Sequence, residues 1–326
     1  MNEDSSNKAK PLASMSLDLD NQWSYMKTHG DAGWEDYPSY FDVIIPLVLD
    51  LLDQLNLKIT FFIVGQDAAL DKNYDWLRLL AERGHEVGNH SFHHEVWLHT
   101  YPKENIKREI LEAEESIHRA TGQKPVGFRG PGFVYSPILL QVLAENNYLY
   151  DATILPTFIG PLARAYYFWK SNLSREEKEQ RKKIYSSFSE GFRPVKPYYW
   201  KLDSNLELLE IPVTTIPILK TPFHLSYLLY LYGISKILMH IYLKLAMMLC
   251  QTTKSAPSFL LHPLDFVGNR EVSELSFFPG MDIGAEQKTK LFTGVIKTIR
   301  SHFELATMSA HAESVSKSID PKFQNP

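Results

Sequence analysis

The stretch His85–His94 reads HEVGNHSFHH, a short run with apolar positions that ends in a cluster of histidines. We expect His85 to Asn89 to form a strand that leads into this cluster. His90 and His94 are four residues apart, which places two side chains on one side when the backbone makes a helical turn. Such a pair suits a divalent metal ion, but a catalytic metal site usually takes three protein ligands.

The best source of a third ligand is the acidic pair Asp18-Leu19-Asp20, close to the start of the chain. The apolar residues 13–17 before it predict a strand. Successive residues of a strand point to opposite faces, and Asp18 and Asp20 both have to reach one site. We therefore expect the strand to end or twist at Leu19.

Apolar runs of strand length alternate with amphipathic segments along most of the chain, which indicates an α/β fold built from parallel βαβ units. The expected strands cover 13–17, 58–64, 85–89, 126–129, 148–151, 258–261 and 304–308, and the expected helices cover 41–55, 75–84, 103–121, 136–146 and 284–303. The number of units favours a barrel over an open sheet. Catalytic residues of such barrels lie at the carboxyl ends of the strands, where Asp18, Asp20, His90 and Arg129 all fall.

Residues 155–257 interrupt this alternation, and we expect most of them to form an insertion or lid within a single domain of residues 1–326. The segment contains a charged helical piece (SREEKEQRKKIY), a linker rich in proline and aromatic residues (FRPVKPYYW) and a strand (LELLEIPV). An apolar stretch follows at 217–250. The tail, about 318–326, is expected to be frayed.

Composition limits the functional class. The chain has 326 residues, of which 44% are hydrophobic, and a net charge of −4. The chain has no surplus of basic residues to neutralise nucleic-acid phosphates, so we expect no nucleic-acid partner. The single cysteine, Cys250, excludes an intramolecular disulfide. The polar first residues lack an apolar signal region, which predicts a cytoplasmic protein.

The apolar stretch 217–250 leaves two interpretations open. Lysines and histidines interrupt it too often for a helix that spans a membrane. It can be a helix buried against the barrel, or an interfacial lid that makes peripheral contact with the inner membrane surface.

Four short motifs together carry a resemblance: SLDLDNQW (16–23), HSFHH (90–94), FRGPGF (128–133) and LLHP (260–263). The set resembles the polysaccharide deacetylase family, also called carbohydrate esterase family 4 or the NodB-homology domain, over roughly residues 14–309 without the insertion. Its first motif has a D-x-D form in place of adjacent aspartates, and is similar to the branch with cytoplasmic and glycosyltransferase-linked deacetylases. The resemblance implies a distorted (β/α) barrel of the NodB-homology type, here with an apolar helical insertion between the late strands.

The resemblance also implies a metal centre. Asp20, His90 and His94 would hold one divalent ion, for which zinc is the first expectation, and cobalt, nickel, manganese and iron remain open. His93 could compete with His94 as a ligand, but the four-residue spacing favours His94.

Further roles follow from the same resemblance. Asp18 would be the general base, Arg129 would pair with it, and His262 would be the general acid. The acid that orients His262 stays open between Asp265 and Asp151. The backbone N–H of Gly132 would donate to the oxyanion. Apart from the resemblance, composition alone suggests that the aromatic residues near these motifs, Trp23, Phe133 and Tyr135, could stack on sugar rings.

We therefore expect a hydrolase of linear amide C–N bonds in which a metal-activated water removes an acetyl group from an N- or O-acetylated sugar, either a polysaccharide or a lipid-linked glycan. Two alternatives remain. One is a metal-dependent deformylase or amidohydrolase acting on a small-molecule or lipid-linked amide, and the other is an inactive glycan-binding homologue. Each motif alone has an ordinary structural explanation, and only their order and their positions at strand ends favour catalysis. The sequence leaves the oligomeric state open.

Overall fold

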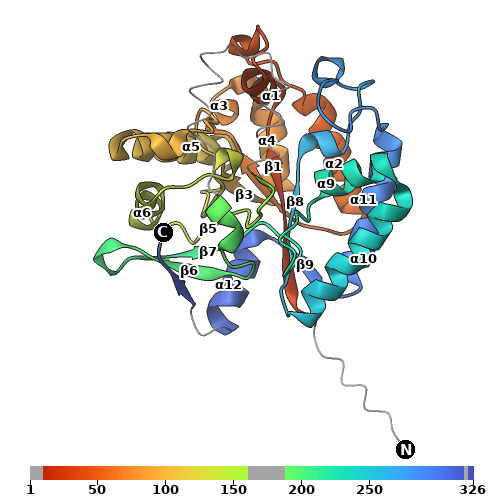
Figure 1. Ribbon diagram of the computed structural model, residues 1–326. Helices are drawn as coiled ribbons and strands as arrows, with labels where there is room; N and C mark the ends of the chain where they lie inside the picture. The colour runs from red at the N-terminus through yellow and green to blue at the C-terminus, as the bar shows by residue number, and fades with distance from the viewer. Residues whose placement is uncertain (1–9, 161–187, 319–321) are drawn as a thin grey trace, which may run out of the picture.

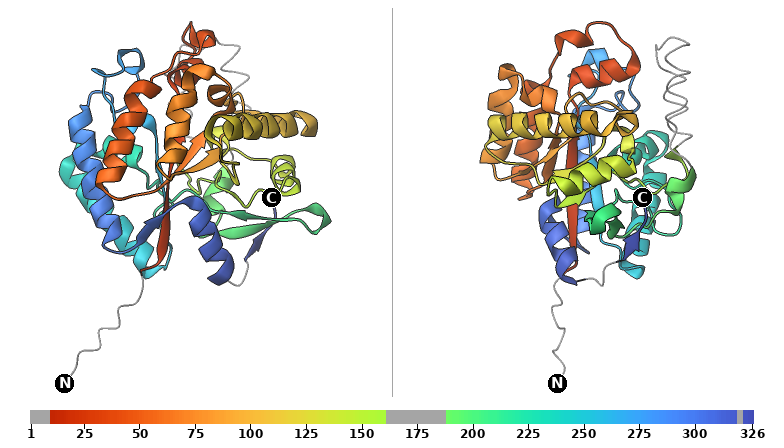
Figure 2. Two further views of the ribbon diagram at one scale, coloured as in Figure 1. Left: turned by 180° about the vertical axis from the view of Figure 1, so that it is seen from behind. Right: turned by 90° about the vertical axis from the view of Figure 1, so that its left-hand side faces the viewer.

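The computed structural model describes residues 10–160, 188–318 and 322–326. A mostly parallel sheet runs through it, with helices packed around the outside (Figures 1 and 2). The strands are β1 (Leu12–Leu19), β2 (Thr60–Ile63), β3 (Glu86–Asn89), β4 (Gly127–Phe128), β5 (Tyr150–Asp151), β6 (Tyr198–Lys201), β7 (Glu207–Glu210), β8 (Ser258–Leu261), β9 (Glu304–Ala306) and β10 (Phe323–Gln324). The helices are α1 (Gln22–His29), α2 (Phe41–Gln54), α3 (Gly65–Ala68), α4 (Tyr74–Glu82), α5 (Lys103–Thr121), α6 (Pro137–Glu145), α9 (Leu225–Ile234), α10 (Lys236–Thr252), α11 (Ala285–Arg300) and α12 (Met308–Ser318).

The strand order explains how one end of the molecule gathers polar side chains. The order is β10-β6-β7-β5-β4-β3-β2-β1-β8, with β9 also paired to β1. All neighbouring pairs from β7 to β8 are parallel, so their carboxyl ends lie at the same edge. The antiparallel strand β6 and then β10 extend this sheet beyond β7.

The two ends of the parallel series also meet. The amide of Thr214, shortly after β7, donates to the carbonyl of Ser258 at 3.1 Å. In return the Ser258 amide, at the start of β8, donates to Oγ1 of Thr214 at 2.6 Å. These bonds close the sheet into a ring through an irregular segment, and the predicted distorted barrel is confirmed.

The core lies on both sides of the barrel wall. Strand β1 is buried at every position after Leu12, because the barrel interior covers one face and helices cover the other. Helix α2 buries Ile44, Val48 and Leu52 in the same hydrophobic cluster as the apolar residues of β1. Leu51 of the same helix is buried as well, whereas Leu47 and Leu55 are only partly buried.

The region 155–257, predicted as an insertion, contributes to the barrel itself. Strand β7 pairs with β5 inside the ring. The apolar helical insertion between the late strands is confirmed, because α9 and α10 lie between β7 and β8. The charged piece SREEKEQRKKIY falls outside the described residues. Among the described helices, none combines the length and the apolar character needed to cross a membrane.

The prediction of a frayed tail is wrong for its last residues. Phe323 and Gln324 form β10, which pairs with Tyr199 and Trp200 of β6. The ring of Phe323 also packs against that of Tyr199, with centroids 6.1 Å apart. Pairing with an exposed edge strand gives these residues an ordered position that their own sequence does not indicate.

Candidate metal centre and active site

Asp20, His90 and His94 come together at the carboxyl ends of β1 and β3. Asp20 and His90 each directly follow a strand, and the ligand atoms of the three residues all lie within 4.8 Å of one another. The Oδ1 atom of Asp20 is 2.9 Å from Nε2 of His94 and 3.5 Å from Nε2 of His90. One carboxylate oxygen and two imidazole nitrogens converging in this way fit a small divalent cation with nitrogen and oxygen ligands.

The hydrogen bond of the other His90 nitrogen fixes the ring. Nδ1 of His90 lies 2.6 Å from the carbonyl oxygen of Arg129, so this nitrogen carries the proton and donates. The Nε2 atom, whose lone pair is then free in the neutral ring, faces Asp20. A backbone partner of this kind is the usual support of a metal-binding histidine.

The loop from His90 to His94 is not the helical turn that its spacing suggested. Ser91 and His94 have φ angles of 60° and 52°, in the left-handed region. The side chain of Asn89 accepts a hydrogen bond from the Ser91 amide at 2.9 Å, which stabilises the turn after β3. The two histidines meet at Asp20 because this loop curls back over the strand end.

A glutamate of α5 holds the same loop. Oε2 of Glu109 accepts hydrogen bonds from the amides of Phe92 and His93, at 3.1 and 3.0 Å, and Oε1 lies 2.5 Å from Nδ1 of His93. Burial raises the pKa of Glu109, but these bonds outweigh it and lower the pKa below its usual value. His93 is therefore bonded away from Asp20, which favours His94 as the ligand. Sequence reasoning missed Glu109, because it lies 16 positions after His93, on the next α-helix, and no motif marks it.

Asp18 and Arg129 form a buried pair beside the three converging residues. Nη1 of Arg129 donates to both carboxylate oxygens of Asp18, at 3.2 and 3.3 Å, and Nη2 donates to Ser16 at 3.3 Å. The guanidinium also lies over the ring of Phe62, 4.8 Å from its centroid. Asp18 is the last-but-one residue of β1 and Asp20 lies just beyond the end, as expected from the D-x-D spacing.

The loop after Asp20 is held by a second buried carboxyl group. Oδ1 of Asp67 accepts from the side chains of Asn21 and Trp23, at 2.7 and 3.0 Å. Burial raises the pKa of Asp67 to about 7. The hydroxyl of Tyr40 donates to the carbonyl of Asp20. These bonds fix the backbone that carries Asp20.

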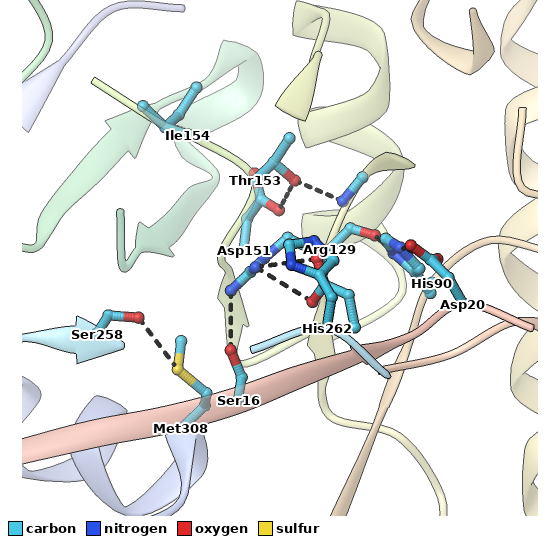
Figure 3. Close-up of polar contacts among 12 residues, drawn as sticks. Ser16, Asp20, His90, Arg129, Asp151, Thr153, Ile154, Ser258, His262 and Met308 are labelled. Carbon is cyan, nitrogen blue, oxygen red and sulfur yellow. Dashed lines mark hydrogen bonds and ion pairs between the residues drawn. The ribbon is translucent and has the colours of Figure 1, made fainter. Parts of the chain in front are cut away.

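His262 directly follows β8, the neighbour of β1 on its other side. Its Nδ1 atom lies 3.1 Å from Oγ of Ser226, a residue of α9. The Ser226 hydroxyl is also hydrogen-bonded to the Asp265 side chain, whose pKa is raised by burial despite this bond. The Ser226 hydroxyl donates its proton to the Asp265 carboxylate, and its oxygen accepts from Nδ1–H of His262. Ser226 therefore connects the imidazole ring to the acid. Figure 3 shows Asp20, His90, Arg129 and His262 gathered at the ends of neighbouring strands.

Asp265 therefore contacts the ring through Ser226. Its direct bond to His262 is with the backbone, where the amide donates to Oδ2 at 2.9 Å. Sequence analysis did not single out Ser226, because it lies 36 positions before His262, in the apolar insertion.

Asp151, the other acid considered for His262, belongs to a separate buried group. Thr153 donates to its Oδ1 at 2.5 Å, and Glu210 of β7 is hydrogen-bonded to it. Burial raises the pKa of both carboxyl groups, and the charge of Asp151 raises that of Glu210 further. The positive charge of Arg129 acts on Asp151 and links this pair to the site.

The residues proposed to touch substrate have different surroundings. Gly132 has a φ of 68°, and a Cβ atom there would lie 3.4 Å from Val96, so the glycine suits this turn. Phe133 is partly exposed after it. Trp23 is only 1% exposed and donates to Asp67, so its predicted stacking on a sugar is wrong. The half-buried ring of Tyr135 packs against Trp200, 5.2 Å away, and its hydroxyl accepts from Arg193.

Comparison with known proteins shows which family part of this chain resembles. Residues 31–150 match the sequence model described as polysaccharide deacetylase. A peptidoglycan-N-acetylglucosamine deacetylase of Bacillus cereus is 33% identical over 107 residues, which are 32% of this chain and 37% of that protein. A peptidoglycan deacetylase of Helicobacter pylori is 25% identical over 159 residues, 46% of this chain and 52% of that protein. The chain thus spans between about a third and a half of these relatives.

The fold has a counterpart among solved structures. A Mycobacterium smegmatis protein classed as a polysaccharide deacetylase superposes with a TM-score of 0.61 at 18% identity, covering 99% of this chain and 96% of that one. At this identity the comparison shows a shared fold only. The shared fold includes residues outside 31–150, the range that matches the sequence model. Residues 31–150 therefore resemble the polysaccharide deacetylase family in sequence, and nearly the whole chain shares its fold with the Mycobacterium smegmatis protein.

Proposed function

We propose that this protein is a metal-dependent hydrolase that removes an acetyl group from an acetylated glycan. The observation that carries the proposal is the convergence of Asp20, His90 and His94 beside the Asp18–Arg129 pair. The names of the relatives support the substrate class, because the proteins of Bacillus cereus and Helicobacter pylori are both called peptidoglycan deacetylases. Zinc is the proposed ion, since two imidazoles and one carboxylate leave further coordination positions open for a water molecule and substrate.

Each residue of the site has a place in the proposed reaction. A bound divalent ion supplies polarisation of the acyl carbonyl and makes a water molecule more acidic. Asp18 accepts the proton of the water that attacks the acyl carbon, while Arg129 holds the carboxylate in place. The Gly132 amide donates to the oxyanion. The bond from carbon to the sugar nitrogen or oxygen then breaks, His262 gives its proton to that atom, and acetate leaves.

The first test is metal content together with acetate release from acetylated chito-oligosaccharides and peptidoglycan. We expect about one equivalent of zinc or a similar ion in the wild type, lost in His94→Ala. His93→Gln should keep the metal, because His93 bonds to Glu109 and not to Asp20. Asp18→Asn should keep fold and metal but lose at least roughly a hundredfold in turnover.

Two outcomes would contradict the proposal. A wild type that takes up no ion after incubation with zinc, cobalt, nickel, manganese or iron would remove the metal centre. A loaded protein that binds acetylated glycans but releases no acetate would point to a non-catalytic glycan-binding protein. Full activity of Asp18→Asn would reassign the base.

A further inference from the structure

The insertion formed by α9 and α10 presents an apolar surface to solvent. Figure 1 shows the two helices at the edge of the molecule, on the side away from α5 and α6. The side chains on this surface that are large, apolar and exposed are Tyr230, Ile234, Ile237, Leu238, Ile241 and Met248. Ile237 is 74% exposed, which is far more than a residue of a helix packed in a protein core. Contiguous exposed apolar side chains of this kind mark an interaction surface.

Helix α10 is apolar on two opposite faces. Its buried face carries Met239, Leu243, Ala246, Met247 and Cys250. At about 100° per residue, Ile237, Ile241, Lys244 and Met248 lie within roughly 60° of arc on the other side. The buried face holds α10 in the fold, so the exposed face can meet only something outside the barrel.

The segment of the chain that carries this face has charges of one sign. From Ile211 to Leu264 the sequence has no aspartate or glutamate, whereas it has lysines at 220, 236, 244 and 254. Lys236, His240 and Lys244 line a shallow surface pocket together with Ile237 and Ile241. An apolar stripe with cations along its border is the pattern of a helix that lies at the surface of a membrane.

We propose that this face docks on a lipid surface with anionic headgroups. Its apolar residues are Tyr230, Ile234, Ile237, Leu238, Ile241 and Met248, and Lys236 and Lys244 lie at its border. Isoleucine and methionine side chains would enter the boundary between headgroups and acyl chains, and the lysines would contact phosphate groups. A second copy of the chain is a poorer occupant, because a two-fold contact would bring the same lysines together with no acidic residue of the segment between them. The proposal does not rest on the proposed function.

The test is flotation of the full chain with vesicles of phosphatidylcholine alone and of phosphatidylcholine mixed with phosphatidylglycerol. We expect binding to the mixed vesicles, weakened at least about tenfold in roughly 0.5 M salt. The double variant Ile237→Glu/Ile241→Glu should lose binding to both kinds of vesicle. The double variant Lys236→Gln/Lys244→Gln should lose the preference for anionic vesicles. All variants should keep the circular dichroism spectrum of the wild type, because the changed side chains are exposed.

Matched controls come from other helices. Ile138 of α6 is 40% exposed, and Ile138→Glu should leave flotation unchanged. Lys297→Gln on α11, also at an exposed position, should do the same. The proposal is overturned if the wild type does not float with anionic vesicles, or if the isoleucine variant floats as the wild type does. It is also overturned if the wild type remains off the vesicles and light scattering shows a dimer that the isoleucine variant abolishes.

Discussion

At the scale of single residues, Ser226 is the unexpected member of the site. Its hydroxyl lies between Nδ1 of His262 and the Asp265 carboxyl group. We expect Ser226→Ala to lower kcat roughly tenfold, because the His262 ring would lose the bond that sets its orientation and the position of its proton. KM should change little, and the metal content should stay the same. Steady-state kinetics with the substrate that the wild type deacetylates would measure this.

Two further variants separate positioning from stability. Ser226→Thr keeps a hydroxyl at the same place and should restore most of the lost kcat. Ser235→Ala removes the hydroxyl that caps α10 in the same insertion, and should lower the free energy of unfolding without changing kcat. Equal kcat for Ser226→Ala and the wild type would exclude a role for this bond in positioning His262.

The residues predicted from motifs were those that stand next to strand ends in the sequence. Asp18, Asp20, His90 and Arg129 could be placed together because parallel strands end at one edge. Ser226, Glu109 and Glu210 could not, because each reaches the site from another element and no local pattern marks it. Trp23 was misassigned for the same reason: its partner Asp67 lies 44 positions further along the chain.

At the scale of elements, α5 supports the metal centre through Glu109. This carboxylate accepts two backbone hydrogen bonds from the loop before His94. We expect Glu109→Ala to weaken metal binding at least roughly tenfold, because the loop would lose its fixed conformation. Competition with a chelator of known affinity would measure the effect.

A control on the same helix is Glu112→Ala, at an exposed position, which should leave metal affinity unchanged. Unchanged affinity in Glu109→Ala would show that Asn89 and the strand end fix the loop without help from α5.

Elements were predictable where their own sequence carries the signal. The helix expected over 103–121 and the strand expected over 258–261 agree with α5 and β8 at both ends. The loop 90–94 was misjudged as a helical turn because spacing alone does not report backbone conformation. Strand β10 escaped prediction because two residues form a strand only where an edge such as β6 is available.

At the scale of the whole molecule, closure of the barrel depends on contacts that no periodicity predicts. Thr214 and Ser258 join the ends of the ring across 44 positions. Behind the same wall, His311 of α12 lies 2.8 Å from the hydroxyl of Ser14 in β1. Burial of the imidazole lowers its pKa from 6.5 to about 4. The fold therefore contains a neutral histidine that takes up a proton readily only when the chain unfolds.

This histidine should make stability depend on pH. Between 6.5 and about 4 the unfolded chain binds a proton at His311 that the folded chain does not, so the free energy of unfolding falls as the pH is lowered through this range. Between about pH 7.5 and about pH 4.5 this residue should remove roughly 2 to 3 kcal/mol. Other buried groups act in the opposite direction: the pKa of Asp67 is raised to about 7, so its protonation stabilises the fold on acidification.

The contribution of His311 is therefore measured as a difference in the loss of stability on acidification between the wild type and a variant at this position. His311→Gln keeps a side chain that can bond to Ser14 but has no proton to gain, so its stability should fall less than that of the wild type over the same range of pH. Urea unfolding of both proteins in the presence of a chelator, near pH 7.5 and near pH 4.5, measures the four free energies. The chelator removes any dependence on metal binding, and the titration of all other groups cancels in the comparison. If both proteins lost the same stability on acidification, His311 would have the same pKa in the folded and in the unfolded chain. Burial against Ser14 would then not determine its ionisation.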